Sequence, residues 1–376
     1  MENLTENREK QDAQEGGGSN GGSTGGSNGG STLIIGGKVF GDLAAGGLKK
    51  GNPLLADDVL VTAIAADGLV RVTAAESTAT CEKARIIHGT SALATAALGR
   101  ALTAAALLSS QLKNDTDSVC LQINGKGPLG RIVCISDVRA RVRGYVANPK
   151  AELPLRVSDG KIDVAAGVGK GFLQIIKDLS LKEPYIGTSA LVSGEIAEDL
   201  TYYFAASEQV PSSVALGVRI GPDPEGKEPF RVEKAGGFII QLMPGAPDSL
   251  IDDLEKRISG LPSVTTLLAA GATVQDIIHD VFKGYSPEIE TSHWFGYVCG
   301  CSRGRMQAAL AAVGRKDLTE IYNDGQGAEL CCNFCNKKYF FTTEEIGAML
   351  AQPAPEKEDG EGDPEAHQES SEEQSR

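Results

Sequence analysis

The stretch FGYVCGCSRGR, residues 295–305, contains the first of two closely spaced cysteine pairs. Cys299 and Cys301 form a C-x-C pair, and Cys332 and Cys335 form a C-x-x-C pair after thirty intervening residues. Two such pairs around one compact insert are typical of a zinc site with four thiolate ligands. Four thiolates leave no open position for water, so the pattern indicates a structural metal and argues against a hydrolytic one.

The one-residue spacer of the C-x-C pair permits a second kind of chemistry. Two thiolates held this close can bind one metal, and they can also oxidise to each other in a small, strained ring. A strained disulfide has a more oxidising potential than a relaxed one. Flanking cations are expected to favour thiolates, which oxidise faster than thiols; these are Arg303, Arg305, Lys337 and Lys338. From the residues alone, a structural zinc clip and a redox switch both remain open.

The chain has eight cysteines, and four of them lie outside the two pairs. Cys331 directly precedes Cys332, but the C-x-x-C spacing favours Cys332 as the ligand, with Cys331 as a possible competitor. The other three are Cys81, Cys120 and Cys134. Cys120 and Cys134 lie in apolar, strand-like runs, which is typical of inert core thiols.

Composition limits the classes of protein that remain. The chain has 376 residues, of which 41% are hydrophobic and 23% are charged, as expected for a protein with a sizeable core. The formal charge is −14, and residues 353–376 contribute half of it, with nine acidic and two basic residues. This acidity disfavours nucleic acid as a partner. The polar start, MENLTENREKQDAQ, and the absence of an apolar run near 20 residues predict a cytoplasmic protein without membrane attachment.

Hydrophobic periodicity predicts an α+β body followed by helices. Residues 57–78 show two β-rich runs around Asp67-Gly68, a hairpin signal. Two Ala/Leu-rich helices should follow, separated at Gly89, with Ser91 capping the second. Strand-like runs continue to about residue 244, interrupted by a helix that contains Glu195, Glu198 and Asp199. Residues 247–283 then change to helical periodicity, and Thr342 with Glu345 predicts a capping box for a last helix.

Several features resemble catalytic motifs, but their context is wrong. Gly125, Gly127 and Gly130 satisfy G-x-G-x-x-G, yet a strand-like run follows where a dinucleotide site needs a helix. A glycine-rich hairpin is the better interpretation, and GVGKG at 167–171 lacks the spacing of a phosphate loop. The acids of the 195–199 helix have no metal or histidine partner and are interpreted as a solvated face. His88 is interpreted as a turn or core histidine. These patterns do not support an enzyme.

The order of several further motifs resembles the 33 kDa chaperonin family, the redox-regulated heat-shock holdases of bacteria. The similarity extends from about residue 57 to about residue 350 and includes HGTSALATAALGRALTAAALL (88–108), GPLGRIV (127–133), AGGFIIQLMPGAP (235–247) and the two cysteine pairs. The resemblance implies that Cys299, Cys301, Cys332 and Cys335 bind one Zn²⁺ in a reduced, inactive form. It also implies that oxidative stress forms the disulfides Cys299–Cys301 and Cys332–Cys335 and releases the zinc. The oxidised form, a homodimer, would then hold unfolding or oxidatively damaged client proteins without ATP.

The resemblance also implies an α+β chaperone domain at 53–245, a redox-sensitive helical linker at 246–290 and a zinc-binding switch domain at 291–352. Composition, and not the resemblance, predicts a disordered Gly/Ser-rich extension at 1–52 and a disordered acidic tail at 353–376. The alternative from the residues themselves is a constitutive zinc-ribbon interaction protein without redox switching.

Overall fold

The structure is a computed structural model that describes residues 33–35, 38–40 and 58–351. It divides into residues 1–46 and residues 47–376. In the first unit, β1 (Leu33–Ile35) and β2 (Lys38–Phe40) pair antiparallel. The rest of the predicted extension at 1–52 and the predicted tail at 353–376 lie outside the described residues.

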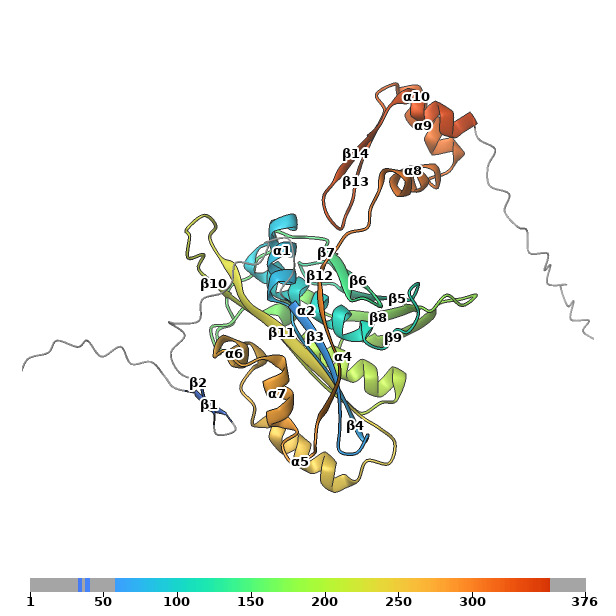
Figure 1. Ribbon diagram of the computed structural model, residues 1–376. Helices are drawn as coiled ribbons and strands as arrows, with labels where there is room; N and C mark the ends of the chain where they lie inside the picture. The colour runs from blue at the N-terminus through green and yellow to red at the C-terminus, as the bar shows by residue number, and fades with distance from the viewer. Residues whose placement is uncertain (1–32, 36–37, 41–57, 352–376) are drawn as a thin grey trace, which may run out of the picture. The chain divides into compact units, whose positions relative to one another are not determined.

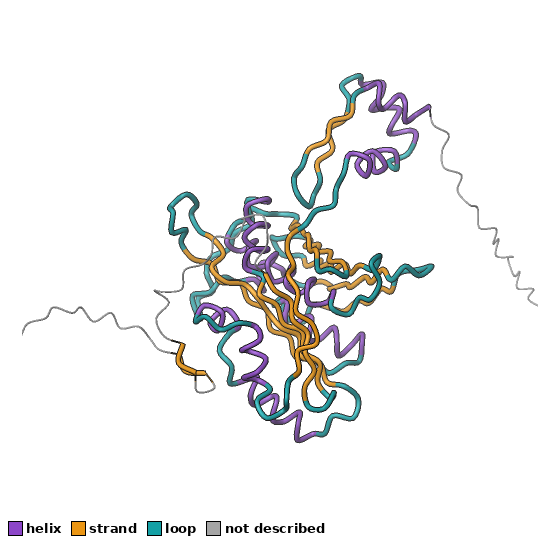
Figure 2. Tube along the Cα trace, viewed as in Figure 1, coloured by secondary structure: helices purple, strands orange, loops and turns teal. Residues whose placement is uncertain are grey.

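The second unit contains a sheet of ten strands in the order β10-β11-β4-β3-β12-β7-β6-β5-β8-β9. Figure 2 shows the strands in orange. With the helices described below, this sheet confirms the predicted α+β class. Its strands are β3 (Asp58–Ala65), β4 (Val70–Glu76), β5 (Ser118–Gly125), β6 (Arg131–Asp137), β7 (Arg141–Val146), β8 (Gly171–Asp178), β9 (Tyr185–Ala190), β10 (Ser212–Gly221), β11 (Arg231–Leu242) and β12 (Glu288–Tyr297).

Strand β12 joins the two halves of this sheet. Most of the strand pairs antiparallel with β3, with His293 opposite Leu60. Its last two residues pair with β7 instead, and this pairing is parallel. The strand crosses the predicted linker boundary at residues 290 and 291, and two residues after its end the chain reaches Cys299. The strand therefore connects the centre of the sheet directly to the cysteine pairs.

Helices α1 (Thr78–His88) and α2 (Ala92–Ser109) follow the first hairpin as predicted. Gly89 ends α1 with a left-handed φ of 54°, and the Ser91 side chain accepts a hydrogen bond from Ala94 N, which confirms the predicted break and cap. The hairpin turn is also confirmed, because Asp67 and Gly68 have φ values of 52° and 89°. Such values suit the Asp-Gly pair.

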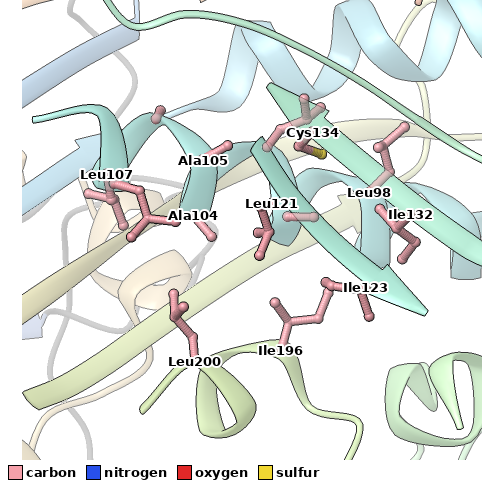
Figure 3. Packing of buried hydrophobic residues seen from close by; sticks show 14 of the residues in the cluster. Leu98, Ala104, Ala105, Leu107, Leu121, Ile123, Ile132, Cys134, Ile196 and Leu200 are labelled. Atoms are coloured by element: carbon pink, nitrogen blue, oxygen red, sulfur yellow. The ribbon is translucent and has the colours of Figure 1, made fainter. Parts of the chain in front are cut away.

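Helix α2 forms the centre of the main core. Its alanines and leucines pack against Leu121, Ile123 and Ile132 from the sheet (Figure 3). The helix is long and apolar enough to cross a membrane, but 89% of its apolar window is buried inside the protein. Burial at this level is typical of a core helix, and small alanines let α2 approach the strands closely.

Three helices cover the opposite face of the sheet: α5 (Asp248–Ser259), α6 (Val264–Ala269) and α7 (Val274–Val281) (Figure 1). In β11, Ile239 belongs to the α2 core, whereas Phe238 and Ile240 are buried as well and point to the other side. Helix α6 packs on β11, and α7 packs on β3 and β4. The predicted helical character of residues 247–283 is confirmed, and these helices lie on the sheet.

The interpretation of the 195–199 acids as a solvated face is wrong for one of them. Asp199, in α4 (Ile196–Tyr203), is fully buried and accepts hydrogen bonds from the backbone N–H groups of Val192, Ser193 and Gly194. Its carboxylate therefore organises the loop before the helix, which compensates the cost of burial. Glu195 is half-buried and pairs with Arg100.

The two glycine-rich motifs, residues 125–130 and residues 167–171, pack against each other through their backbones. A Cβ added to Gly125, at the end of β5, would lie 1.9 Å from the carbonyl oxygen of Val168, in α3 (Val164–Val168). A Cβ on Gly171, at the start of β8, would lie 2.0 Å from the carbonyl oxygen of Asn124. The predicted hairpin between β5 and β6 is confirmed. These glycines are therefore explained by close backbone packing.

Asp58, the first residue of β3, gives the fold a pH dependence. It is 2% exposed and accepts hydrogen bonds from the N–H groups of Ala79 and Thr80 at the start of α1. Burial raises the pKa of this carboxyl from 3.8 to about 6. The folded chain therefore favours the protonated form, so the free energy of unfolding should rise as the pH falls from about 6 towards 4. This pKa shift corresponds to a change of roughly 2–3 kcal/mol in the free energy of unfolding.

The comparison of urea denaturation at pH 4.5 and pH 7 in wild type and Asp58→Asn tests this expectation. Asparagine keeps an acceptor oxygen for the helix N-terminus but has no titrating group. We expect the wild type to gain roughly 2 kcal/mol more on acidification than the variant. Equal pH dependence in the two proteins would contradict the assignment.

The last part of the chain folds around a small core of its own. Its elements are α8 (Arg303–Ala311), α9 (Arg315–Asp324), β13 (Ala328–Cys331), β14 (Lys338–Phe341) and α10 (Thr343–Ala351). The buried members of this hydrophobic core are Leu310, Leu318, Tyr339, Phe341, Ile346 and Met349. The predicted capping box is confirmed, because Thr342 N donates to Glu345 and Glu345 N donates to Thr342 Oγ1. We call residues 299–351 the cysteine module.

Candidate metal centre

The four predicted ligands come together at one point. The sulfurs of Cys299, Cys301, Cys332 and Cys335 all lie within 4.8 Å of one another. Cys299 Sγ lies 3.7 Å from Cys332 Sγ, and Cys301 Sγ lies 3.4 Å from Cys335 Sγ. Sulfurs at about 2.3 Å from a tetrahedral zinc would be separated by about 3.8 Å. The arrangement fits a metal held by four thiolates.

A tight turn between β13 and β14 presents the second cysteine pair. Cys332 N donates to the carbonyl of Lys337, and the N–H groups of Cys335 and Asn336 both donate to the carbonyl of Cys332. Asn336 has a left-handed φ of 57°, which asparagine tolerates better than most residues. We call residues 332–336 the knuckle. The turn directs both sulfurs of the pair to the same side.

The sulfurs have unequal surroundings. The hydroxyl of Tyr339 lies 3.1 Å from Cys301 Sγ and, as hydrogen-bond donor, lowers the pKa of that thiol to about 7. Burial raises the pKa of Cys299 and Cys335. Tyr339 follows the second cysteine pair by only four residues, but its phenol was not predicted as part of the site. A cysteine with a lowered pKa is the more reactive one in such a cluster.

The knuckle also contacts the body. The ring of Phe334 packs edge-on against Tyr145, with centroids 5.4 Å apart, and under the guanidinium of Arg143 at 5.3 Å. Asn336 Nδ2 donates to the carbonyl of Ile87 at 2.7 Å. Phe334 therefore connects the knuckle to β7, and Asn336 connects it to α1.

Tyr297 completes this connection from the side of β12. Its hydroxyl lies within hydrogen-bond distance of the carbonyls of Gly144 and Phe334, and it accepts from Gly144 N. His88 Nε2 lies 3.1 Å from the same oxygen. Burial raises the pKa of Tyr297, so the phenol stays neutral and can donate. His88, predicted as a turn or core histidine, therefore supports the phenol that holds the knuckle.

A sequence model described as Hsp33 protein matches residues 58–342 of this chain. The chain belongs to the Hsp33 family. It is 50% identical over 295 residues to the 33 kDa chaperonin of Ruminiclostridium cellulolyticum. The matched region covers 78% of this chain and 98% of that protein. It is 46% identical over 296 residues to the 33 kDa chaperonin of Clostridium perfringens, over 78% and 91% of the two chains.

A solved member of the Hsp33 family has the same fold. The crystal structure of the 33 kDa chaperonin from Thermotoga maritima superposes with a TM-score of 0.70 at 38% identity, over 78% of this chain and 97% of that one. The resemblance stated from the motifs is therefore confirmed. Family membership makes this chain a chaperone, and four clustered cysteines give it a site that can hold a metal ion.

Three of the four flanking cations of this Hsp33 member contact neighbouring oxygens. Arg303 pairs with Glu345, and Lys338 pairs with Glu329. Arg305 donates to the carbonyl of Gly300. Their charges are therefore engaged with neighbouring oxygens, and the hydrogen bond from Tyr339 dominates the lowered pKa of Cys301.

The remaining cysteines are separated from the four clustered sulfurs. Cys331 is exposed at the end of β13, and the metal cluster contains Cys332 in its place. Cys81 and Cys134 are buried, and burial raises the pKa of both thiols as well as that of half-buried Cys120. These three thiols have little thiolate character, which agrees with the interpretation of Cys120 and Cys134 as inert.

Proposed function

We propose that this chain is a redox-regulated, ATP-independent holdase that binds unfolding and oxidatively damaged proteins in the cytoplasm. The observation that carries the proposal is the cluster of four sulfurs in a module whose knuckle is bonded to the body through Tyr297 and Asn336. A chemical change at the sulfurs can therefore alter contacts of the chaperone body. In this proposal the reduced, zinc-bound form is inactive.

Zn²⁺ is the metal that suits this donor set. Soft thiolate ligands in a closed tetrahedral arrangement favour zinc over hard cations such as magnesium and calcium. When bound, zinc supplies a crosslink between the end of β12 and the knuckle. Cys299 and Cys301 would hold it from the β12 side, and Cys332 and Cys335 from the knuckle side, with one ion per chain.

Oxidation would break this crosslink. A cysteine thiolate attacks one oxygen of hydrogen peroxide, which gives a sulfenic acid and releases hydroxide. The thiol of the neighbouring cysteine then displaces water from the sulfenic acid and forms a disulfide. We propose the pairs Cys299–Cys301 and Cys332–Cys335, which consume two molecules of peroxide per chain. Paired sulfurs no longer act as thiolate ligands, so the site loses its metal.

Loss of the metal would reach the helices through β12. The cysteine module would unfold, and Phe334 would leave its contacts with Tyr145 and Arg143. The end of β12 would lose its contact with the knuckle. The helices α5–α7, which pack on the sheet, directly precede β12 in the sequence. We propose that residues 246–290 then expose apolar surface, which binds clients and joins two oxidised chains in a homodimer.

The deciding experiment measures zinc release and chaperone activity together. Reduced protein is treated with hydrogen peroxide under mild heat, and we expect release of about one zinc per chain with a parallel gain in suppression of client aggregation. Reduction should reverse the gain. Zinc release without any gain would contradict the proposal. Binding of partners that is unchanged by oxidation would favour a constitutive zinc-ribbon interaction protein instead.

A further inference from the structure

A groove of about 610 Å³ lies between α1, the end of β12 and the turn that joins β6 to β7. Three large apolar side chains that line it are exposed: Trp294 by 69%, Ile86 by 64% and Val298 by 42%. Trp294 is the only tryptophan of the chain. Exposed apolar side chains gathered along one groove are typical of a surface that binds a partner.

The charges of the groove indicate the chemistry of that partner. Three cations line it: Lys83, Arg139 and Arg141. The one acid among the lining residues, Glu82, is engaged elsewhere, because it pairs with Arg85 and accepts from Val232 N. An apolar floor with cations at its sides suits a ligand in which apolar groups and carboxylates alternate.

Two of these cations already have partners, but weak ones. Arg139 pairs with Asp115 at 3.3 Å, and both side chains are mostly exposed. Arg141 pairs with Asp137, and its own side chain is half exposed. Surface pairs of this kind contribute at most about 1 kcal/mol, so a carboxylate of the ligand can replace them at little cost.

We propose that this groove binds extended segments of unfolded polypeptide in which aromatic or aliphatic side chains alternate with acidic ones. The inference rests on the proposed function and gives that function a client site in the body of the chain. Apolar side chains of the segment would contact Ile86, Trp294 and Val298, and its carboxylates would face Lys83 and Arg141. Unfolded chains offer such segments, whereas folded proteins bury their apolar side chains.

The groove is connected to the metal centre. Ile87 and Tyr297 both line it, and both are bonded to the knuckle, Ile87 through Asn336 and Tyr297 through Phe334. Release of the metal would free these two lining residues. The affinity for the acidic, apolar segment should therefore rise when zinc leaves, and bound segment should in turn favour the zinc-free state.

The test uses the full chain and two labelled peptides. One is a twelve-residue peptide of alternating leucine and aspartate with a terminal fluorescein, and the other carries lysine in place of aspartate; fluorescence anisotropy measures binding. Ile86→Ser removes an exposed lining side chain, and Leu181→Ser is the matched control, because Leu181 is 71% exposed and lies in the loop between β8 and β9, outside the groove.

We expect the aspartate peptide to bind wild type and Leu181→Ser equally and to bind Ile86→Ser about tenfold more weakly. It should bind more tightly after oxidation, and the lysine peptide should bind weakly to every variant. Equal binding to Ile86→Ser and wild type would overturn the proposal, as would equal binding of the two peptides. An effect of Ile86→Ser only on self-association in sedimentation would assign the groove to a second copy of the chain, which also overturns it.

Failure of the groove and failure of the redox function give different results. If oxidised wild type suppresses client aggregation and Ile86→Ser does so equally, the redox function stands and the groove is not the client site. If oxidised wild type does not suppress aggregation, but peptide binding still depends on Ile86 and on aspartate, the groove binds polypeptide without redox control.

Discussion

Chelation of the metal is expected to unfold residues 299–351 while residues 58–245 stay folded. The module of about 50 residues is too small to be stable on packing alone, and its core contains only six buried hydrophobic residues. In small zinc-binding peptides the metal supplies about 10–16 kcal/mol of apparent free energy. The free energy lost with the metal should therefore be larger than the stabilisation that the module's own hydrophobic core can provide.

Hydrogen exchange measures this directly. With a zinc chelator, the amides of α8, α9 and α10 should lose protection, whereas those of α2 should keep it. Matched variants locate the ligand in the Cys331-Cys332 pair: Cys332→Ser should lose the metal and behave like the chelated protein, and Cys331→Ser should keep one zinc per chain. Retained protection of the module after complete zinc removal would contradict the expectation, and the reverse result for the two variants would reverse the ligand assignment.

The sequence predicted the four cysteines that the structure brings together, but not their surroundings. Cysteine spacing alone indicated Cys299, Cys301, Cys332 and Cys335, because a metal imposes its own short-range pattern. Tyr339, in β14, acts on Cys301, which lies just before α8, and a single aromatic residue in a strand gives no sign of such a contact. The partners of the flanking cations could not be predicted, because charge near a cysteine in sequence does not fix which carboxylate or carbonyl the side chain will meet.

The contact between the module and the body could not be predicted either. It joins Asn336 to Ile87 and Phe334 to Tyr145, residues far away in the chain. Local patterns contain no information about which distant segments meet, so the role of β12 as a bridge became visible only in the fold. Local signals such as the Ser91 cap and the Asp67-Gly68 turn were predicted correctly, because a few neighbouring residues decide them.

The glycine motifs are a second case in which local sequence does not reveal which distant segments pack together. Sequence context was sufficient to exclude nucleotide binding, because a strand follows Gly130 where a helix would be required. It could not show that Gly125 and Gly127 press against the backbone of residues 167 and 168. This contact joins α3 and β8 to β5, and through β6 and β7 the same half of the sheet holds the end of β12.

Gly125→Ala is therefore expected to destabilise the body by about 3 kcal/mol. The new methyl group would lie 1.9 Å from the carbonyl oxygen of Val168, and a backbone atom cannot rotate away as a side chain can. Relief requires β5 and the end of α3 to separate, which breaks packing in the main core. Urea denaturation followed by the fluorescence of Trp294, which reports on β12, should show the loss.

A matched control distinguishes this close contact from a general effect of replacing glycine. At Gly260, at the end of α5, the nearest atom to an added Cβ is a carbonyl oxygen at 3.4 Å, and the backbone there is right-handed. Gly260→Ala should stay within about 0.5 kcal/mol of wild type. If Gly125→Ala were equally mild, β5 and α3 would have to be free to move apart, and the half of the sheet that anchors Tyr297 would be less rigid than its packing indicates.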